Sequence, residues 1–249
     1  MPFPNYFSIA LQIDDHRVMQ RVDAPEILDS DACSPAEVQA TLQDIGRVNR
    51  WFGGVATTQK MVERVARASA ISHFSMLEVA AGSGELAEIV RQRLARRGIT
   101  LDVTLLDRAR SHLPRDHGVV ADALALPFDD NAFDLIGCNL FVHHLQPEQV
   151  GEFVREALRV CRRAVLINDL IRHPLHLALA YAGYPIMRSR VAWLDGLTSV
   201  RRSYVPDEVR SLLASVSPQT AAQVEISRNY LFRMGVIVWK GPVAKTHTA

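Results

Sequence analysis

The sequence has few cysteines and no excess of charge of either sign. Its three cysteines, Cys33, Cys138 and Cys161, lie far apart and form no CxxC pair. An odd, scattered set argues against a disulfide framework and a structural zinc site, and it favours a reducing cytoplasm. The 28 basic and 27 acidic residues almost cancel, so the chain lacks the positive charge that nucleic-acid binding needs. We therefore expect a small-molecule partner and no nucleic acid.

Long hydrophobic runs are missing as well. No stretch reaches the roughly 18 consecutive apolar residues of a membrane-spanning helix, and the amino terminus lacks the early basic cluster of a signal peptide. At roughly 150 residues per domain, 249 residues fit one large domain, or one domain with a sub-domain. We expect a loose lead-in at 1–18, a helical cap at 19–72, a main domain at 73–240 and a flexible tail at 241–249.

The hydrophobic pattern changes near residue 75. Before it, the capping box Ser34-Pro35-Ala36-Glu37 predicts a helix that Gly53-Gly54 ends, and a second helix is expected at 56–70. After it, short β-type runs alternate with helical segments, which is typical of a parallel sheet with crossover helices. The expected strands cover residues 76–80, 100–106, 118–121, 133–139 and 164–169, with helices at 85–96 and 147–161.

The last third of the chain has a different organisation. Residues 174–190 are mostly apolar, a turn is expected at Asp195-Gly196, and Pro206 opens another helix. Two β-like runs follow, at 223–227 and 230–239. Too few residues join them for a crossover, so they must pair antiparallel.

The densest motif runs from Met76 to Ala87, where an apolar strand ends in the turn Gly82-Ser83-Gly84 and a helix begins. Glycine lets backbone approach a ligand closely, and the helix amino terminus faces that ligand. The run also satisfies the GxGxx(G/A) pattern of dinucleotide folds. Asp107 stands about 20 residues further on, where such folds place a ribose carboxylate. The glycines alone leave the identity of the cofactor open.

Three other features bear on the choice of cofactor. Glu78 lies inside the strand, where its carboxylate approaches a loop that would hold a cationic amino-acid ligand, and nicotinamide folds need no acid there. The pair Asp122-Ala123 follows the third strand and precedes the run at 127–134. The antiparallel final pair is the third feature.

Together these residues resemble the class I S-adenosylmethionine (SAM)-dependent methyltransferases over roughly residues 75–240. The resemblance implies an α/β, Rossmann-like sheet of seven mostly parallel strands in the order 3-2-1-4-5-7-6. Strand 7 would be antiparallel, and a helical lid would follow strand five at about 170–205. Ala80 stands where many members have glycine, a mild departure. The motifs that carry the resemblance are the loop at 78–84, Asp107, Asp122-Ala123, the run at 127–134 and residues 139–145.

This resemblance implies SAM as the cofactor, with S-adenosylhomocysteine (SAH) as its product. Glu78 and Gly82 would line its amino-acid end, Asp107 would accept from the ribose hydroxyls, and Asp122 with the Ala123 amide would meet the adenine. The residues expected at the cofactor are Glu78, Ala80, Gly82, Gly84, Asp107, Arg108, Asp122, Ala123 and Asn139.

Residues outside the cofactor motifs resemble a narrower group of bacterial methyltransferases related to the quinone-biosynthesis type. They are found at 48–54, 168–170, 195–196 and 199–204. Some of that group accompany polyketide or phenolic pathways, and aromatic side chains in a lid suit a flat acceptor. For each of these side chains, packing in the core or solvation is the alternative. The residues expected at the substrate are Trp51, His144, His173, Tyr181, Tyr184, Arg201 and Tyr204.

Methyl transfer from a sulfonium is an in-line displacement, which needs alignment, exclusion of water and a base where the acceptor carries a proton. The candidate catalytic residues are His143 and His144, directly after strand four, and Asp169, which ends strand five. Adjacent residues of an extended segment point opposite ways, so we expect at most one histidine to face the acceptor. Packing or helix capping is the alternative for each residue.

A metal is not expected. The histidine dipeptide lacks the spacing for shared ligation, and Asn168-Asp169 alone does not make a magnesium cluster. The expected function is therefore SAM-dependent methyl transfer to a small aromatic or quinone-like acceptor, favouring oxygen, by a chain that could form a homodimer. The alternatives are C-methylation, an NAD-dependent oxidoreductase that uses the same loop, and a non-catalytic partner subunit.

Overall fold

The computed structural model describes residues 19–29, 33–114, 117–214, 216 and 222–241. The lead-in expected at 1–18 and most of the expected tail, 242–249, lie outside these ranges. Seven strands form one sheet in the order β3-β2-β1-β4-β5-β7-β6, as predicted. β7 runs antiparallel to both of its neighbours. The strands are β1 (His73–Val79), β2 (Thr100–Asp107), β3 (Val119–Val120), β4 (Phe133–Asn139), β5 (Cys161–Leu170), β6 (Gln223–Asn229) and β7 (Arg233–Trp239).

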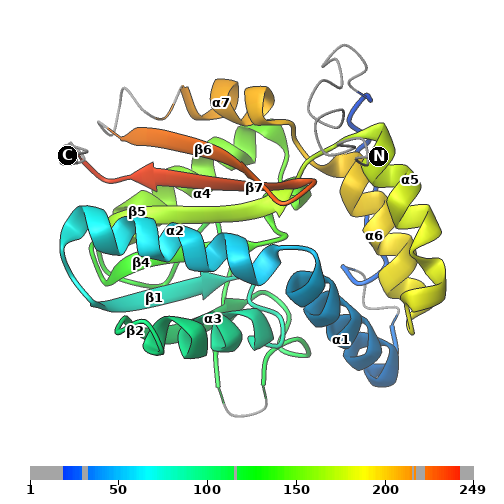
Figure 1. The fold of residues 1–249 in the computed structure, drawn as a ribbon, viewed down its shortest axis with the longest axis horizontal. Helices are drawn as coiled ribbons and strands as arrows, with labels where there is room; N and C mark the ends of the chain where they lie inside the picture. Colours follow the sequence, from blue (N-terminus) through cyan, green and yellow to red (C-terminus); the bar gives the residue numbers. More distant parts are fainter. Residues whose placement is uncertain (1–18, 30–32, 115–116, 215, 217–221, 242–249) are drawn as a thin grey trace, which may run out of the picture.

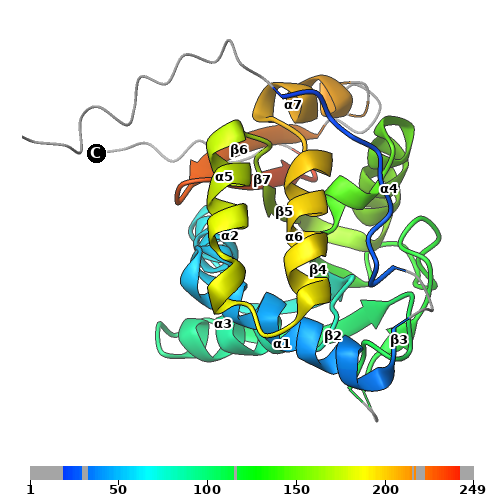
Figure 2. The same ribbon diagram turned by 90° about the vertical axis from the view of Figure 1, so that its right-hand side faces the viewer.

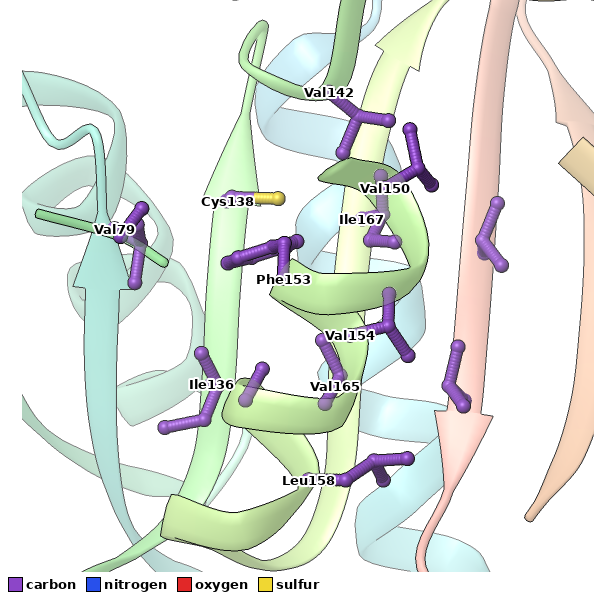
Figure 3. Packing of buried hydrophobic residues seen from close by; sticks show 14 of the residues in the cluster. Val79, Ile136, Cys138, Val142, Val150, Phe153, Val154, Leu158, Val165 and Ile167 are labelled. Atoms are coloured by element: carbon purple, nitrogen blue, oxygen red, sulfur yellow. The ribbon is translucent and has the colours of Figure 1, made fainter. Parts of the chain in front are cut away.

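The central strands are apolar on both faces because helices cover both sides of the sheet. α2 (Gly54–Ser69) and α3 (Glu85–Ala95) lie on one face, and α4 (Pro147–Val160) and α7 (Pro206–Ala214) lie on the other (Figure 1). Figure 3 shows the packing of α4, where Phe153 and Val154 contact the strands that carry Ile136, Cys138 and Val165. This cluster fixes the ends of β4 and β5 relative to that of β1.

Three further elements lie across the carboxyl end of the sheet. The parallel strands point towards α1 (Pro35–Trp51), α5 (Pro174–Ala182) and α6 (Arg190–Arg202), and Figure 2 views these helices from that side. The predicted capping box begins α1: the Ser34 side chain accepts from the Glu37 amide, and the Glu37 carboxylate accepts from the Ser34 amide. No helix in the described part of the chain is both long and apolar enough to span a membrane.

Two expectations about local structure are wrong. Asp195 and Gly196 do not form a turn but lie within α6, because the Asp195 carboxylate accepts hydrogen bonds from the amides of Ile27 and Leu28 instead of capping its own chain. The third strand, expected over 118–121, contains two residues. The apolar lid run is interrupted by a short 3-10 helix, η3 (Tyr184–Ile186), between α5 and α6.

Candidate active site

The loop after β1 has the backbone conformation that its glycines predict. Ala80, Gly82 and Gly84 all have positive φ angles, of 53°, 53° and 72°. A Cβ atom on Gly84 would lie 2.6 Å from Leu105 Cδ1, so only glycine fits there. The loop turns the chain directly into α3 and brings its amides to the carboxyl edge of the sheet.

Asp107 closes this loop at the end of β2. Its Oδ2 accepts from the Gly82 amide at 2.9 Å, its Oδ1 accepts from the Ala109 amide at 3.0 Å, and His112 Nδ1 lies 3.4 Å from Oδ1. Burial raises the pKa of Asp107. His112 and the two amides lower it by more than burial raises it, so the net pKa is below its ordinary value. The side chain is therefore an ionised acceptor at the position predicted for ribose.

Glu78 is a buried carboxyl at the end of β1. Asn139 donates to its Oε1, while Oε2 has no hydrogen-bond partner among the described residues. Burial raises the pKa of Glu78 to about 7, and the bond from Asn139 opposes that shift. Thr58 Oγ1 donates to Asn139 Oδ1 at 2.9 Å and so fixes the amide. A buried acceptor without a donor points to a positively charged ligand.

One cavity of about 1780 Å³ occupies the carboxyl end of the sheet. It lies where the strand order reverses between β1 and β4, the point at which open α/β sheets bind ligands. Its volume exceeds the roughly 300–1,000 Å³ of a typical small-ligand site, so it has room for a cofactor and an acceptor. Among the described residues, eight of the nine expected at the cofactor line it, all except Gly84: Glu78, Ala80, Gly82, Asp107, Arg108, Asp122, Ala123 and Asn139.

The geometry of His143 and His144 differs from the prediction. The expectation that at most one of them faces the acceptor assumed an extended segment, but both residues lie in a 3-10 turn, η2 (Val142–His144). In that turn their ring centroids are 4.3 Å apart, and both residues line the cavity. Leu140, with a φ of 53°, redirects the chain out of β4 just before this turn.

Asp169 orients His143. Its Oδ1 lies 2.7 Å from His143 Nδ1, and its Oδ2 accepts from the His143 amide at 3.0 Å. On the other side of the ring, His143 Nε2 lies 3.4 Å from Glu26 Oε1. Burial lowers the pKa of His143. The charges of Asp169 and Glu26 raise it by more than burial lowers it, so the net pKa is about 9.

His144 is the more accessible of the two rings, with a side-chain exposure of 23% against 2% for His143. Its Nδ1 lies 3.0 Å from Asp29 Oδ2, and its Nε2 lies 3.7 Å from Glu26 Oε2. Arg202 donates to the His144 carbonyl at 3.0 Å and lies beside Asp29. Both histidines are thus enclosed by carboxylates.

Sequence reasoning missed Glu26 and Asp29. They belong to residues 19–29, a segment without regular secondary structure that lies beside α6 (Figure 2). Arg21 holds the segment down by donating to the carbonyls of His143 and Leu145. The segment has no hydrophobic period and no motif, so its sequence contained no signal that could have placed these acids beside the histidines.

The residues expected at the substrate are mostly outside the cavity wall. Only His144 lines it, and within the described chain Trp51, His173, Tyr181, Tyr184, Arg201 and Tyr204 do not. Tyr204 is buried and donates to the Leu145 carbonyl at 2.8 Å, so packing, the alternative considered, describes it. The same helices contribute other side chains to the wall: Val38, Leu42 and Ile45 from α1, Leu179 from α5 and Trp193 from α6.

Comparison with known proteins agrees with this geometry. Residues 77–167 match the family model described as a methyltransferase domain. A search of curated proteins finds no match. Three similar solved structures show the fold. A SAM-dependent methyltransferase from Aquifex aeolicus is 12% identical, with 84% of this chain and 99% of that chain covered and a TM-score of 0.53.

The second is the plantazolicin methyltransferase BpumL in complex with a monoazolic desmethylPZN analog and SAH. It is 12% identical, with 84% of this chain and 98% of that one covered and a TM-score of 0.59. The third is an O-methyltransferase family 2 protein from Planctomyces limnophilus in complex with apigenin. It is 17% identical, with 85% of this chain and 63% of that one covered and a TM-score of 0.55.

Proposed function

We propose that this chain, a SAM-dependent methyltransferase by its matched domain and its fold, transfers a methyl group to the oxygen of a small aromatic or quinone-like acceptor. One observation carries the proposal. A single cavity is lined both by the residues that suit the cofactor and by the two histidines after β4. Donor and acceptor can therefore meet inside one cavity, as an in-line displacement requires.

The residues at the cofactor position fit SAM. The free Oε2 of Glu78 offers a buried acceptor to its ammonium group, and the ionised Asp107 offers acceptors to its ribose hydroxyls. Asp122 and Ala123 line the same cavity beyond β3. When bound, SAM supplies the electrophilic methyl carbon. The chain's own task is to position that carbon and to keep water away from it.

The acceptor half of the cavity supports an apolar, flat ligand. Val38 and Leu42 on α1, Leu179 on α5 and Trp193 on α6 contribute apolar wall, and pockets of this kind bind small molecules mainly through apolar contact. The resemblance of residues 199–204 to the quinone-biosynthesis group supports the same class of acceptor.

We assign activation of the acceptor oxygen to His143, His144 and Asp169. A hydroxyl acceptor must lose its proton, and a histidine with a carboxylate partner in the cavity wall is a usual device for this step. An electron-rich carbon of a similar acceptor would be aligned in the same way, so C-methylation is the second candidate. The nicotinamide alternative is not favoured, because the matched domain is a methyltransferase domain.

The test is a product screen. The purified chain is incubated with SAM and a panel of phenols, quinones and polyketide-like aromatics, and mass spectrometry detects a gain of one methyl group. NMR of the product then distinguishes O-methyl from C-methyl. His143→Ala and His144→Ala should each lower turnover by about tenfold or more. Calorimetric binding of NAD without binding of SAH would contradict the proposal.

A further inference from the structure

The atoms around His143 and His144 have the geometry of a cation site. Among the residues that the structure describes, Glu26, His143 and His144 each offer one ligand atom, all within 4.8 Å of one another. Glu26 Oε1 lies 3.4 Å from His143 Nε2, and Glu26 Oε2 lies 3.7 Å from His144 Nε2. Ligands about 2.05 Å from a tetrahedral zinc ion are about 3.4 Å apart. The two separations, made by different oxygens of Glu26, are close to that value, so shared ligation needs the three side chains to move closer than their present spread of up to 4.8 Å.

A second feature orients both rings for ligation. His143 Nδ1 faces Asp169, and His144 Nδ1 faces Asp29, so each ring directs its Nε2 towards Glu26. Histidines that bind metals usually donate their other N–H to a carboxylate or carbonyl in this way, which fixes the tautomer and strengthens the ligand. His143 with Asp169 and His144 with Asp29 are two such histidine–carboxylate pairs, and the two histidines are adjacent in the chain.

A third feature is a buried ring nitrogen without a hydrogen bond. His143 Nε2 makes no hydrogen bond to any described residue, and the His143 side chain is only 2% exposed. The carboxylates of Glu26, Asp29 and Asp169 surround the two rings. The guanidinium groups of Arg202 and Arg108 act on Asp29, and that of Arg233 acts on Asp169, which leaves Glu26 as the carboxylate that faces both Nε2 atoms.

We propose that Glu26, His143 and His144 bind a divalent first-row transition metal ion, zinc by preference, facing the acceptor half of the cavity. Two imidazoles and one carboxylate suit zinc better than magnesium or calcium, which take oxygen ligands. Three protein ligands leave one position open, and all three residues line the cavity. The sequence alone predicted no metal from the histidine dipeptide and Asn168-Asp169, whereas this proposal rests on the 3-10 turn at 142–144 and on Glu26 from residues 19–29.

The consequence deepens the proposed function and rests on it. An acceptor oxygen bound at the open position would release its proton to solvent more readily, because the ion would stabilise the oxyanion that remains. The imidazoles then act as ligands, and Asp169 and Asp29 are positioning residues for them. Binding of the ion itself does not depend on which acceptor is used.

The experiment titrates chelator-treated full-length protein with Zn²⁺ and with Co²⁺. We expect one ion per chain by elemental analysis after dialysis. The Co²⁺ form should show a visible ligand-field spectrum without a thiolate charge-transfer band, because no cysteine belongs to the site. Glu26→Gln and His144→Ala should each weaken binding at least tenfold, and Asp29→Asn, which alters only the partner of a ligand, should weaken it about tenfold to hundredfold.

His73→Ala is the matched control. His73 also pairs with a carboxylate, since its Nε2 lies 2.7 Å from Asp102 Oδ2, but it lies at the opposite end of β1 and is exposed. Its removal should leave binding of the ion unchanged. Circular dichroism and SAH binding of each variant separate loss of the site from loss of the fold.

Two outcomes would overturn the proposal: less than one ion per chain at micromolar free Zn²⁺, or a Co²⁺ spectrum and affinity that Glu26→Gln and His144→Ala leave intact. Methyl transfer is measured separately, in chelator-treated and zinc-loaded protein. Metal binding without transfer to any acceptor would refute the proposed function alone. Transfer at full rate in protein without metal would refute the proposed role of the ion alone.

Discussion

Asn139 donates a hydrogen bond to Oε1 of Glu78, while Oε2 of the same buried carboxyl has no partner in the described structure. We propose that this oxygen accepts from the ammonium group of SAM. We expect Glu78→Gln to weaken SAM binding about tenfold to hundredfold, the size of a lost charge-assisted hydrogen bond. Isothermal calorimetry measures it, and Glu63→Gln, in α2, serves as the control because Glu63 pairs with Arg97 and does not line the cavity. An unchanged affinity in Glu78→Gln would remove this residue from the cofactor site.

The pKa of Glu78 makes the same interaction depend on pH. Burial raises that pKa to about 7 in the free protein, and the ammonium group of SAM favours the ionised form. Binding therefore releases a proton below pH 7. The affinity of the wild-type protein should rise by up to about tenfold per pH unit towards pH 7 and then level off. The affinity of Glu78→Gln should show no such rise, and an identical profile in both proteins would contradict the assignment.

Stability of the cofactor-free protein should respond in the opposite direction. A carboxyl whose folded pKa exceeds its unfolded value favours the fold below the unfolded pKa of about 4.5, and this contribution is lost as the pH rises through about 7. At pH 8 the protein holds a buried charge that Glu78→Gln lacks. The Tm of the variant should therefore exceed that of the wild type at pH 8 and match it near pH 4.5, as measured by scanning calorimetry without cofactor.

The order of the strands could be predicted because the motifs at the ends of several of them resemble those of a family that has this order. The acids Glu78, Asp107 and Asp122 stand where strands end, and each is local to its strand. The orientation of His143 and His144 could not be predicted, because it depends on whether residues 142–144 are extended or form a turn. The carboxylate partners of His144 could not be predicted for another reason: Asp29 is 115 positions away in the chain.

The face that α5 turns to the cavity was unpredictable for a physical reason. The helix is apolar nearly all round and contains no buried residue, so it has no amphipathic period that would identify an inner face. Aromatic residues were therefore expected at the substrate on composition alone. The structure instead directs Leu179 and Ala180 into the cavity wall.

The glycine loop offers a test with an internal control. Gly84 and Gly98 have almost the same positive φ, 72° and 75°, but a Cβ atom would contact Leu105 only at Gly84, and no described atom lies within 4 Å at Gly98. Gly98→Ala should lower the free energy of unfolding by about 1 kcal/mol, from backbone strain alone. Gly84→Ala should cost about 1–3 kcal/mol more, from overpacking, and urea denaturation measures both. Equal costs would show that the loop tolerates a side chain.

Trp193 and Trp51 are two aromatic residues that differ in their position relative to the cavity. Trp193 lines the cavity and packs edge-on against Tyr184 at 4.8 Å, whereas Trp51 is 56% exposed and lies outside the described wall. Removing Trp193 deletes apolar contact with the acceptor, so Trp193→Leu should raise the KM for an aromatic acceptor about tenfold, the effect of about 1.4 kcal/mol. SAM affinity should not change, because the cofactor residues lie on other elements. Trp51→Leu should leave the KM within about twofold. A larger effect from Trp51 than from Trp193 would mean that the cap closes over the acceptor through α1 rather than α6.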